Sequence, residues 1–277
     1  MSAIPTQARA TRPVPPRLHI VPEPTPHLSY SQVRTYSTCS LKWWYSRRFK
    51  PAFVPSALVF GKAWHAAVEC YYQLALEGRP QNLTTLLDAF FTEYRQEKQP
   101  IQYGKNDAQP SAEQVTKMLQ CFLQSVKPGK VIAIEQEIRC PLGEGMPELL
   151  GYIDLVEITQ DEQGRYALNL IDLKTCARTP KDSIDPDQLV LYDYAVRKTG
   201  LLSEFHLPIQ LRYDYMVKTK EPQYGILPVA AGRSERVLEK IKHCWRGMGA
   251  GIAYPCPGWQ CAGCGYKARC GKWPKEV

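Results

Sequence analysis

Two aspartates and a lysine stand in apolar stretches near the middle of the chain. Asp154 lies between aliphatic residues in GYIDLV, and Asp172 and Lys174 lie in ALNLIDLKT. A charged group in such a setting costs free energy unless it is paired or binds a metal. Two carboxylates can hold Mg²⁺ or Mn²⁺ through oxygen ligands, and a nearby lysine can orient water or offset charge on a phosphate. An ordinary buried ion pair between aspartate and lysine is the alternative interpretation.

These two stretches predict a β-hairpin. They flank a polar turn cluster at residues 161–164 that ends in glycine. Side chains alternate across a strand, so Asp172 and Lys174 share one face. Pairing of the strands could then bring Asp154 beside them, which would place two carboxylates next to one amine.

A predicted apolar helix carries a histidine. It runs from about residue 57 to 76, with Gly78 as its stop, and it places His65 and Glu69 one turn apart on the same face. A lone histidine in such a helix is more commonly a packed, hydrogen-bonded residue than a ligand.

A second helix start is predicted at Asp185-Pro186-Asp187-Gln188. Asp185 would be the N-cap, with proline in the first turn. Gln188 and Tyr192 then lie one turn apart on this helix, where both can reach a shared partner.

The remaining elements complete a mixed α/β pattern. A capping box at Ser29 and Gln32 opens a helix that continues through Trp44, amphipathic helices follow at about 83–94 and 111–122, and a last helix spans about 234–248. Strands are predicted at 131–139 and 209–217. In the first, Glu135 and Glu137 share a face. Either glutamate could face the site, but solvent exposure is expected for both. This order of elements predicts an α/β fold with a central mixed sheet flanked by helices.

Three of the ten cysteines lie close together near the end of the chain as C-x2-C-x5-C, namely Cys261, Cys264 and Cys270. This spacing, with glycines around it, predicts a metal or cluster site rather than disulfides or inert thiols. Three thiolates leave a tetrahedral site one ligand short. Cys256 would complete a local zinc ribbon, whereas Cys39 would connect the two ends of the chain.

Length and composition set bounds. The 277 residues can bury one large core, and the 44% hydrophobic and 22% charged residues are typical of a soluble globular protein. No apolar run approaches the roughly 18 residues of a membrane span. The net charge of +8 is compatible with a polyanionic partner. Prolines interrupt residues 1–27, which lack a signal-peptide core, so we expect a disordered tail and a cytoplasmic location.

Six short segments, in order, resemble those of a known family. They are SYSQVRTYSTC with Cys39, FGKAWH with His65, GYIDLV with Asp154, IDLKT with Asp172 and Lys174, QLVLY with Gln188 and Tyr192, and the final C-x2-C-x5-C. From about residue 28 to 273 the chain resembles the RecB-like PD-(D/E)XK nucleases that carry an iron–sulfur cluster. These include the CRISPR-adaptation exonucleases and the AddB nuclease domain. Ile153 replaces the proline of the family name, and Asp172 replaces a frequent glutamate, but both carboxylates are kept.

The resemblance implies a restriction-endonuclease-like fold and a Mg²⁺- or Mn²⁺-dependent deoxyribonuclease, acting as an exonuclease on DNA ends or single strands. His65, Asp154 and Asp172 would bind the metal, and Lys174 would be the catalytic lysine. Gln188 and Tyr192 would orient the site or the DNA strand. A 4Fe-4S cluster would be held by Cys39, Cys261, Cys264 and Cys270, which favours Cys39 over Cys256.

The resemblance also implies a domain organisation. Residues 1–27 would be the tail, 28–254 the nuclease domain with a helical insertion at about 57–127, and 255–277 a cysteine-rich tail packed on the N-terminal helix. DNA is the expected partner, together with proteins of repair, recombination or CRISPR adaptation, and no membrane association is expected. The alternative function is a catalytically silent iron–sulfur or zinc module that binds nucleic acid or supports an assembly.

Overall fold

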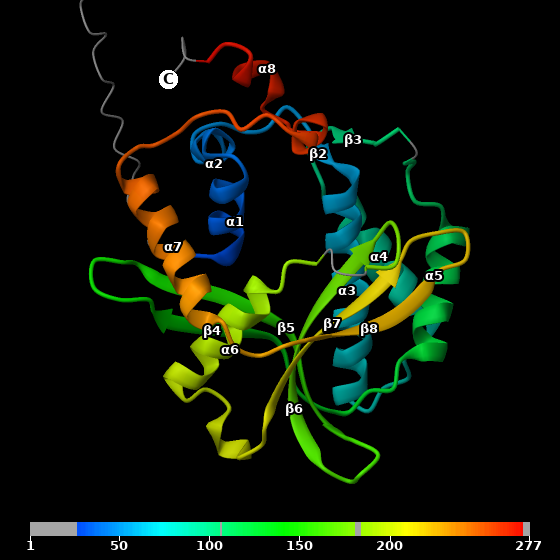
Figure 1. Cartoon of the computed structure of the whole chain (residues 1–277). Helices are drawn as coiled ribbons and strands as arrows, with labels where there is room; N and C mark the ends of the chain where they lie inside the picture. Colours follow the sequence, from blue (N-terminus) through cyan, green and yellow to red (C-terminus); the bar gives the residue numbers. More distant parts are fainter. Residues whose placement is uncertain (1–26, 106, 181–183, 274–277) are drawn as a thin grey trace, which may run out of the picture.

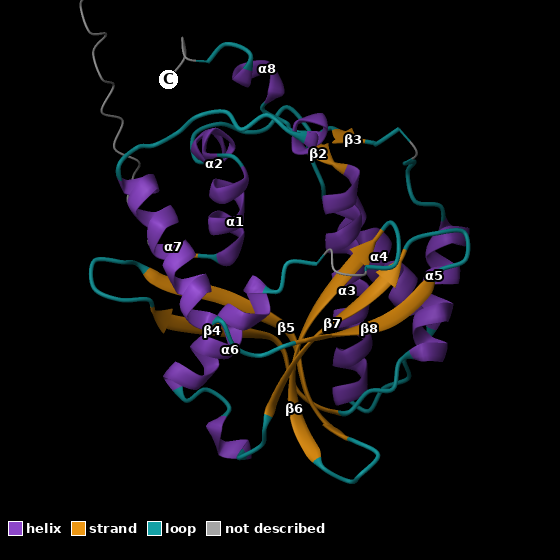
Figure 2. Cartoon of the chain, in the orientation of Figure 1, coloured by secondary structure: helices purple, strands orange, loops and turns teal. Residues whose placement is uncertain are grey.

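The structure is a computed structural model that describes residues 27–105, 107–180 and 184–273. A six-stranded mixed sheet lies at its centre, and helices pack on both faces (Figure 1 and Figure 2). The predicted α/β fold, with a central mixed sheet flanked by helices, is confirmed. Of the predicted disordered tail, residues 1–26 lie outside the described residues, and His27 belongs to the first strand.

The sheet contains β1 (His27–Leu28), β4 (Lys130–Pro141), β5 (Glu148–Gln160), β6 (Tyr166–Cys176), β7 (Ile209–Val217) and β8 (Gln223–Val229). Its order is β1-β5-β6-β7-β8, and β4 also pairs with β5. β5 and β6 form the predicted antiparallel hairpin, which closes where Gly164 N–H donates to Asp161 O at 3.0 Å. β6 and β7 are parallel, and β8 is an antiparallel edge strand.

The long strand β5 has a gap along one of its edges. β4 pairs with residues 148–158 of β5 along one edge. Since a strand has only two edges, β1 and β6 share the other. β1 pairs with residues 148–149 of β5, and β6 pairs with residues 155–160. Residues 150–154 pair with neither strand in the described part of the chain, so the middle of the sheet is open to side chains at this gap.

Three helices cover one face of the sheet (Figure 2). They are α3 (Ser56–Leu76), α4 (Leu83–Arg95) and α5 (Ala112–Ser125). Gly78, with a φ of +64°, follows α3 at the predicted stop. Asn82 and Ser111 cap the two later helices by accepting hydrogen bonds from Thr85 N–H and Gln114 N–H. The apolar faces of these helices pack together with Leu155, Ile171 and Leu173 from the sheet, which anchors α3 beside β6. That these helices form an insertion stays a prediction.

The other face carries α1 (Tyr30–Thr38), α2 (Ser40–Ser46), α6 (Asp187–Thr199) and α7 (Ser234–Gly249). Ser29 caps α1 as predicted, accepting a hydrogen bond from Gln32 N–H at 3.3 Å. The prediction of one helix through Trp44 is wrong, because Cys39 is extended (φ −161°, ψ 105°) and separates α1 from α2. At this break, Cys39 lies beside the last segment of the chain, where its Sγ is 4.0 Å from Tyr254 O.

The segment after α7 crosses α2 and ends in two short helices, η2 (Trp259–Gly263) and α8 (Lys267–Cys270) (Figure 1). Backbone hydrogen bonds attach it to the region around α2, where Leu41 N–H donates to Tyr254 O at 3.1 Å and Ala52 N–H donates to Gly265 O at 2.9 Å. A Cβ atom on Gly265 would lie 2.5 Å from Phe53 O, so this approach requires glycine. Beside it, β2 (Val54–Pro55) and β3 (Ile101–Gln102) form a small parallel pair.

None of the helices in the described ranges is both long enough and apolar enough to cross a bilayer.

Candidate active site

The two predicted aspartates meet where the β5–β6 ladder ends. The last paired residues are Leu155 and Ile171, and one further step in the same register sets Asp154 opposite Asp172. Beyond the last pair, a side chain replaces the backbone as hydrogen-bond acceptor, because Asp154 Oδ2 accepts a hydrogen bond from Leu173 N–H at 2.6 Å. The extended register thus places the two aspartates on neighbouring strands at the edge of the gap in β5.

Lys174 forms an ion pair with the buried Asp172. Apart from this ion pair, Asp172 Oδ2 accepts no hydrogen bond from the described residues. The Lys174 ammonium also lies 5.6 Å from the centre of the Tyr213 ring, a distance that favours a cation–π contact. The shared strand face predicted for Asp172 and Lys174 thus becomes a direct contact, and it leaves a buried carboxylate oxygen able to take a further ligand.

His65 reaches the same place from α3. Its Nε2–H donates to Leu173 O at 2.8 Å, and its Nδ1 lies 3.6 Å from Asp154 Oδ2. Burial lowers the pKa of His65 and favours the neutral ring. In a neutral imidazole that donates through Nε2, Nδ1 carries the lone pair, which is the form that binds a metal.

Glu135 of β4 lies at the site and is also exposed to solvent, as expected. A β-bulge between Val131 and Ala133 shifts the register of β4, and Glu135 itself has a positive φ of 49°. The neighbouring pairs set Glu135 opposite Asp154 across β4 and β5. Ligand atoms of His65, Glu135 and Asp154 lie within 4.8 Å of one another, a grouping that could hold a metal ion. Asp172 is not part of this grouping.

Burial and neighbouring negative charge raise the pKa of two carboxyl groups of the site, Asp154 and Glu135. Burial, and then the charge of Asp172, raises the pKa of Asp154 well above its usual range, although the Leu173 N–H and Lys174 oppose the shift. Burial likewise raises the pKa of Glu135, with further contributions from Glu69 and Asp172. Crowded carboxylates of this kind are stabilised by a bound cation, which restores the charged form.

From α6, Gln188 and Tyr192 face the gap. Gln188 Nε2 donates to Tyr192 Oη at 3.4 Å. Burial raises the pKa of Tyr192 to about 12, and the charges of Asp172 and Asp154 contribute. The Tyr192 ring packs on Gly151, where an added Cβ would lie 2.6 Å from Cε1. The helix begins at Asp187, two residues past the predicted cap, and Asp185 instead accepts the Asp187 N–H at 3.1 Å.

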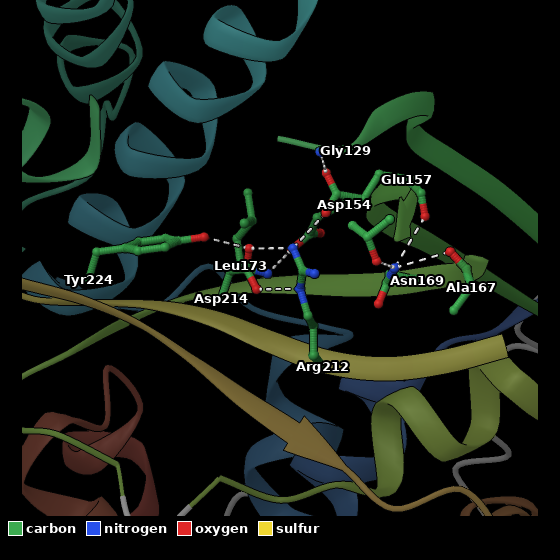
Figure 3. A network of polar contacts seen from close by, with 10 residues as sticks. Gly129, Asp154, Glu157, Ala167, Asn169, Leu173, Arg212, Asp214 and Tyr224 are labelled. Carbon is green, nitrogen blue, oxygen red and sulfur yellow. Dashed lines mark hydrogen bonds and ion pairs between the residues drawn. The ribbon is translucent and has the colours of Figure 1, made fainter. Parts of the chain in front are cut away.

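A buried charge network lies in the strands beside the site (Figure 3). Arg212 of β7 donates to Glu157 Oε1 at 2.7 Å and to Asp214 Oδ1 at 2.8 Å. Tyr224 Oη–H donates to Asp214 Oδ2, also at 2.7 Å, and Gly129 N–H donates to Glu157 Oε2 at 3.0 Å. Both carboxylates are paired, so this network ties β5, β7 and β8 together and supports the strands that carry the site.

A separate cavity of about 320 Å³ is lined by Cys39, Cys256, Cys261, Cys264 and Cys270. Cys39 comes from the break between α1 and α2, and the others come from the final segment. Both Cys39 Sγ and Cys256 Sγ lie near Tyr254 O, at 4.0 and 3.8 Å. Burial raises the pKa of Cys270, and the thiols of Cys39, Cys264 and Cys261 add to the shift. All four predicted ligands, and the alternative ligand, therefore gather around one cavity.

The sequence left open which of Glu135 and Glu137 faces the site, and the structure brings Glu135 to it. Glu135 follows four apolar residues, VIAI, and a carboxylate directly after such a run was a signal that it could face the site. The bulge that turns it cannot be inferred from alternation alone, since alternation assumes a regular strand.

The chain matches the sequence pattern of the PD-(D/E)XK nuclease superfamily over residues 27–271. No curated protein matches it in sequence. Among solved structures, it is similar to a proposed exonuclease from Eubacterium rectale, with 12% identity, a TM-score of 0.45, and coverage of 88% of this chain and 89% of that one. It is also similar to SSO0001, with 12% identity, a TM-score of 0.34, and coverage of 89% and 96%. The match in sequence includes every residue of the site, and the mixed sheet between helices is consistent with the restriction-endonuclease-like core. This chain therefore belongs to the PD-(D/E)XK nuclease superfamily.

Proposed function

We propose that this protein is a Mg²⁺- or Mn²⁺-dependent deoxyribonuclease that hydrolyses phosphodiester bonds at DNA ends or in single strands. The observation that carries the proposal is the grouping of His65, Glu135 and Asp154 ligand atoms within 4.8 Å of one another, beside the ion pair of Asp172 and Lys174. Membership of a nuclease superfamily whose members typically use Mg²⁺ or Mn²⁺ supports it. The preference for ends or single strands follows the resemblance seen in the sequence.

The donor set fits a divalent cation. His65 Nδ1 and the carboxylates of Glu135 and Asp154 are close enough to share one ion, and the buried Asp172 oxygen would complete the set. Oxygen ligands with one imidazole suit Mn²⁺, and oxygen-rich sites suit Mg²⁺. A cation held by these residues would supply Lewis-acid polarisation of the phosphate.

We assign to Lys174 the role of orienting the water that attacks the phosphate. Its ammonium is held by Asp172, so its hydrogen atoms are directed at a fixed position. There it donates hydrogen bonds to the attacking water and to a phosphate oxygen, offsetting charge that develops on the phosphate. The water oxygen forms a bond to phosphorus as one of its protons passes to solvent, the bond to the sugar oxygen breaks, and the leaving oxygen takes a proton from solvent.

Gln188 and Tyr192 are assigned to positioning. They belong to one helix that faces the gap, and a hydrogen bond joins the Gln188 amide to Tyr192, on which the charges of Asp172 and Asp154 act. An amide and a phenol can donate to phosphate oxygens or sugar atoms without reading base sequence.

We further propose that Cys39, Cys261, Cys264 and Cys270 hold a 4Fe-4S cluster. Four thiolates around one zinc ion would lie about 3.8 Å apart, given zinc–sulfur bonds of about 2.3 Å. Among the described residues, His65, Glu135 and Asp154 form the grouping with three ligand atoms within 4.8 Å, and no three cysteines do so. The wider spacing of the thiols favours a cluster over a zinc ribbon, and Cys256 is then an additional thiol beside it.

The test of the nuclease is degradation of end-labelled DNA. We expect purified protein to shorten single-stranded DNA with Mn²⁺ or Mg²⁺, and EDTA to stop the reaction, because the carboxylates alone cannot polarise the phosphate. Single- and double-stranded substrates labelled at either end report the preference and the direction of digestion. Intact labels at every Mn²⁺ concentration would instead favour the silent nucleic-acid-binding module.

A further inference from the structure

Two cavities are lined in part by the same residues of α1 and α6. One, of about 410 Å³, is lined by the open stretch of β5 at residues 150–152 and by Ser29 and Ser31. The other, of about 330 Å³, contains Lys174 and Arg178. Tyr30, Arg34 and Gln188 line both cavities. Arg34 therefore stands between the gap in β5 and the lysine assigned to the water.

The position of Arg34 is fixed by its helix. Tyr30 lies one turn earlier on the same face of α1, and its hydroxyl donates to Asp185 Oδ2 at 2.5 Å. The Lys240 ammonium lies 5.9 Å from the centre of the Tyr30 ring. These contacts join α1 to the segment before α6, so the face of α1 that carries Arg34 is held beside both cavities.

Arg34 keeps its charge available. Its side chain is exposed, and in the described ranges it forms no ion pair within 4.0 Å. The nearest acidic group in the second cavity, Asp185, already accepts hydrogen bonds from Tyr30 and from Asp187 N–H. An exposed guanidinium that forms no ion pair with the described residues is well suited to bind a phosphate in a bidentate manner.

The groups around Arg34 also suit a phosphate chain. Lys174 and Arg178 add positive charge in the second cavity, and the Ser29 and Ser31 hydroxyls lie in the first. Arginine, lysine and serine side chains are the usual donors to phosphate oxygens in protein–DNA contacts. Among the described residues that line the second cavity, Asp185 is the carboxylate, and it forms an ion pair with Lys240 at 3.9 Å.

We propose that Arg34 binds a backbone phosphate of the DNA strand that flanks the phosphate cleaved beside Lys174. This phosphate subsite rests on the proposed nuclease function and adds to it a defined path for the strand. The path runs from the first cavity, past Arg34, to the catalytic lysine.

The test is binding of a short single-stranded oligonucleotide in EDTA, followed by fluorescence anisotropy. Arg34→Gln is compared with Arg95→Gln, which removes the same charge from an exposed position on α4. We expect Arg34→Gln to weaken binding roughly tenfold, as for a lost charge-assisted hydrogen bond. We also expect the slope of log Kd against log salt to fall by about 0.7, the value for one phosphate contact on a single strand. Arg95→Gln should change neither quantity.

Oligonucleotides with one neutral methylphosphonate linkage locate the contact. In wild-type protein, a methylphosphonate at one position should weaken binding by about the same factor as the Arg34→Gln substitution. In Arg34→Gln protein, a methylphosphonate at that position should not weaken binding any further. Equal effects at every position, unchanged binding by Arg34→Gln, or no binding by wild-type protein would each overturn the subsite. Because the assay needs no metal, it is independent of cleavage. A positional effect without Mn²⁺-dependent cleavage would refute only the nuclease, and cleavage without the effect would refute only the subsite.

Discussion

At the scale of single residues, the backbone of Leu173 organises the site. Its N–H donates to Asp154, and its carbonyl accepts from His65. Its side chain is buried in the apolar cluster formed with α3, α4 and α5. The residue between Asp172 and Lys174 thus links both candidate ligands through the main chain. Because the contacts of Leu173 to both ligands use backbone atoms, its side chain has only to pack in the core. This explains why the middle position of the (D/E)XK motif can vary while the acidic residue and the lysine beside it cannot.

Glu135 provides the first prediction. Glu135→Gln should weaken Mn²⁺ binding, measured by calorimetry, by roughly 10-fold or more, because it removes a charged oxygen from a grouping of three ligands. Glu137→Gln is the matched control on the same strand, since Glu137 pairs with Arg139 and Tyr152 at the surface. Equal Mn²⁺ affinity in wild-type and Glu135→Gln protein would remove Glu135 from the metal site.

At the scale of elements, local patterns predicted most of the fold. The hairpin, β7 and α3 follow from alternation, helical periodicity and turn residues, all of which act over a few positions. β8 was missed because Gly225 and Pro228 weaken its strand pattern, although an edge strand tolerates proline. The gap in β5 was equally hidden, because it depends on which strands share an edge, and pairing between distant segments leaves no local trace.

The gap depends on close packing of Tyr192 against Gly151. Gly151→Ala should destabilise the fold by about 1–3 kcal/mol, as overpacking does, and should slow cleavage by moving Tyr192 away from the carboxylates. Gly249→Ala is the control, because an added Cβ at the end of α7 meets nothing within 4 Å. Chemical denaturation and cleavage rates measured side by side give the answer. Wild-type values for both would show that the ring can shift freely.

The buried network on β7 should matter more for stability than its surface counterparts. Arg212→Met leaves Glu157 and Asp214 buried without their cation, which should cost about 3–5 kcal/mol in the free energy of unfolding. Arg139→Met, which breaks exposed ion pairs on β4, should leave the denaturation midpoint nearly unchanged. A midpoint for Arg212→Met equal to that of Arg139→Met would contradict the structural role assigned to the network.

At the scale of the whole molecule, the cysteine cavity joins the two ends of the described chain. Cys39 and Cys261 are 222 residues apart in sequence. Closing a loop of this length restricts the unfolded chain by roughly 5 kcal/mol of conformational entropy. A cluster held across this cavity would therefore stabilise the domain that carries the active site, although it lies outside that site.

Replacing single cysteines tests this link. Cys39→Ser should lose iron and visible colour and should lower Tm, because it removes the ligand that joins the first helices to the final segment. Cys256→Ser should keep both properties, and Cys121→Ser, outside the cavity, controls for loss of a thiol. Iron and sulfide analysis of anaerobically purified protein measures the outcome. A colourless wild-type protein that contains zinc, or loss of metal only in Cys256→Ser, would favour the local zinc ribbon.

In the proposed nuclease, DNA cleavage depends on Asp172 and Lys174. The most direct measurement is the rate of Mn²⁺-dependent DNA cleavage by wild-type, Asp172→Ala and Lys174→Ala proteins with equal iron content, beside Lys117→Ala from an exposed ion pair on α5. Both site variants should lose activity by roughly 100-fold or more, as when a group that stabilises the transition state is removed, while Lys117→Ala keeps the wild-type rate. Wild-type rates in both Asp172→Ala and Lys174→Ala would contradict the proposed active site.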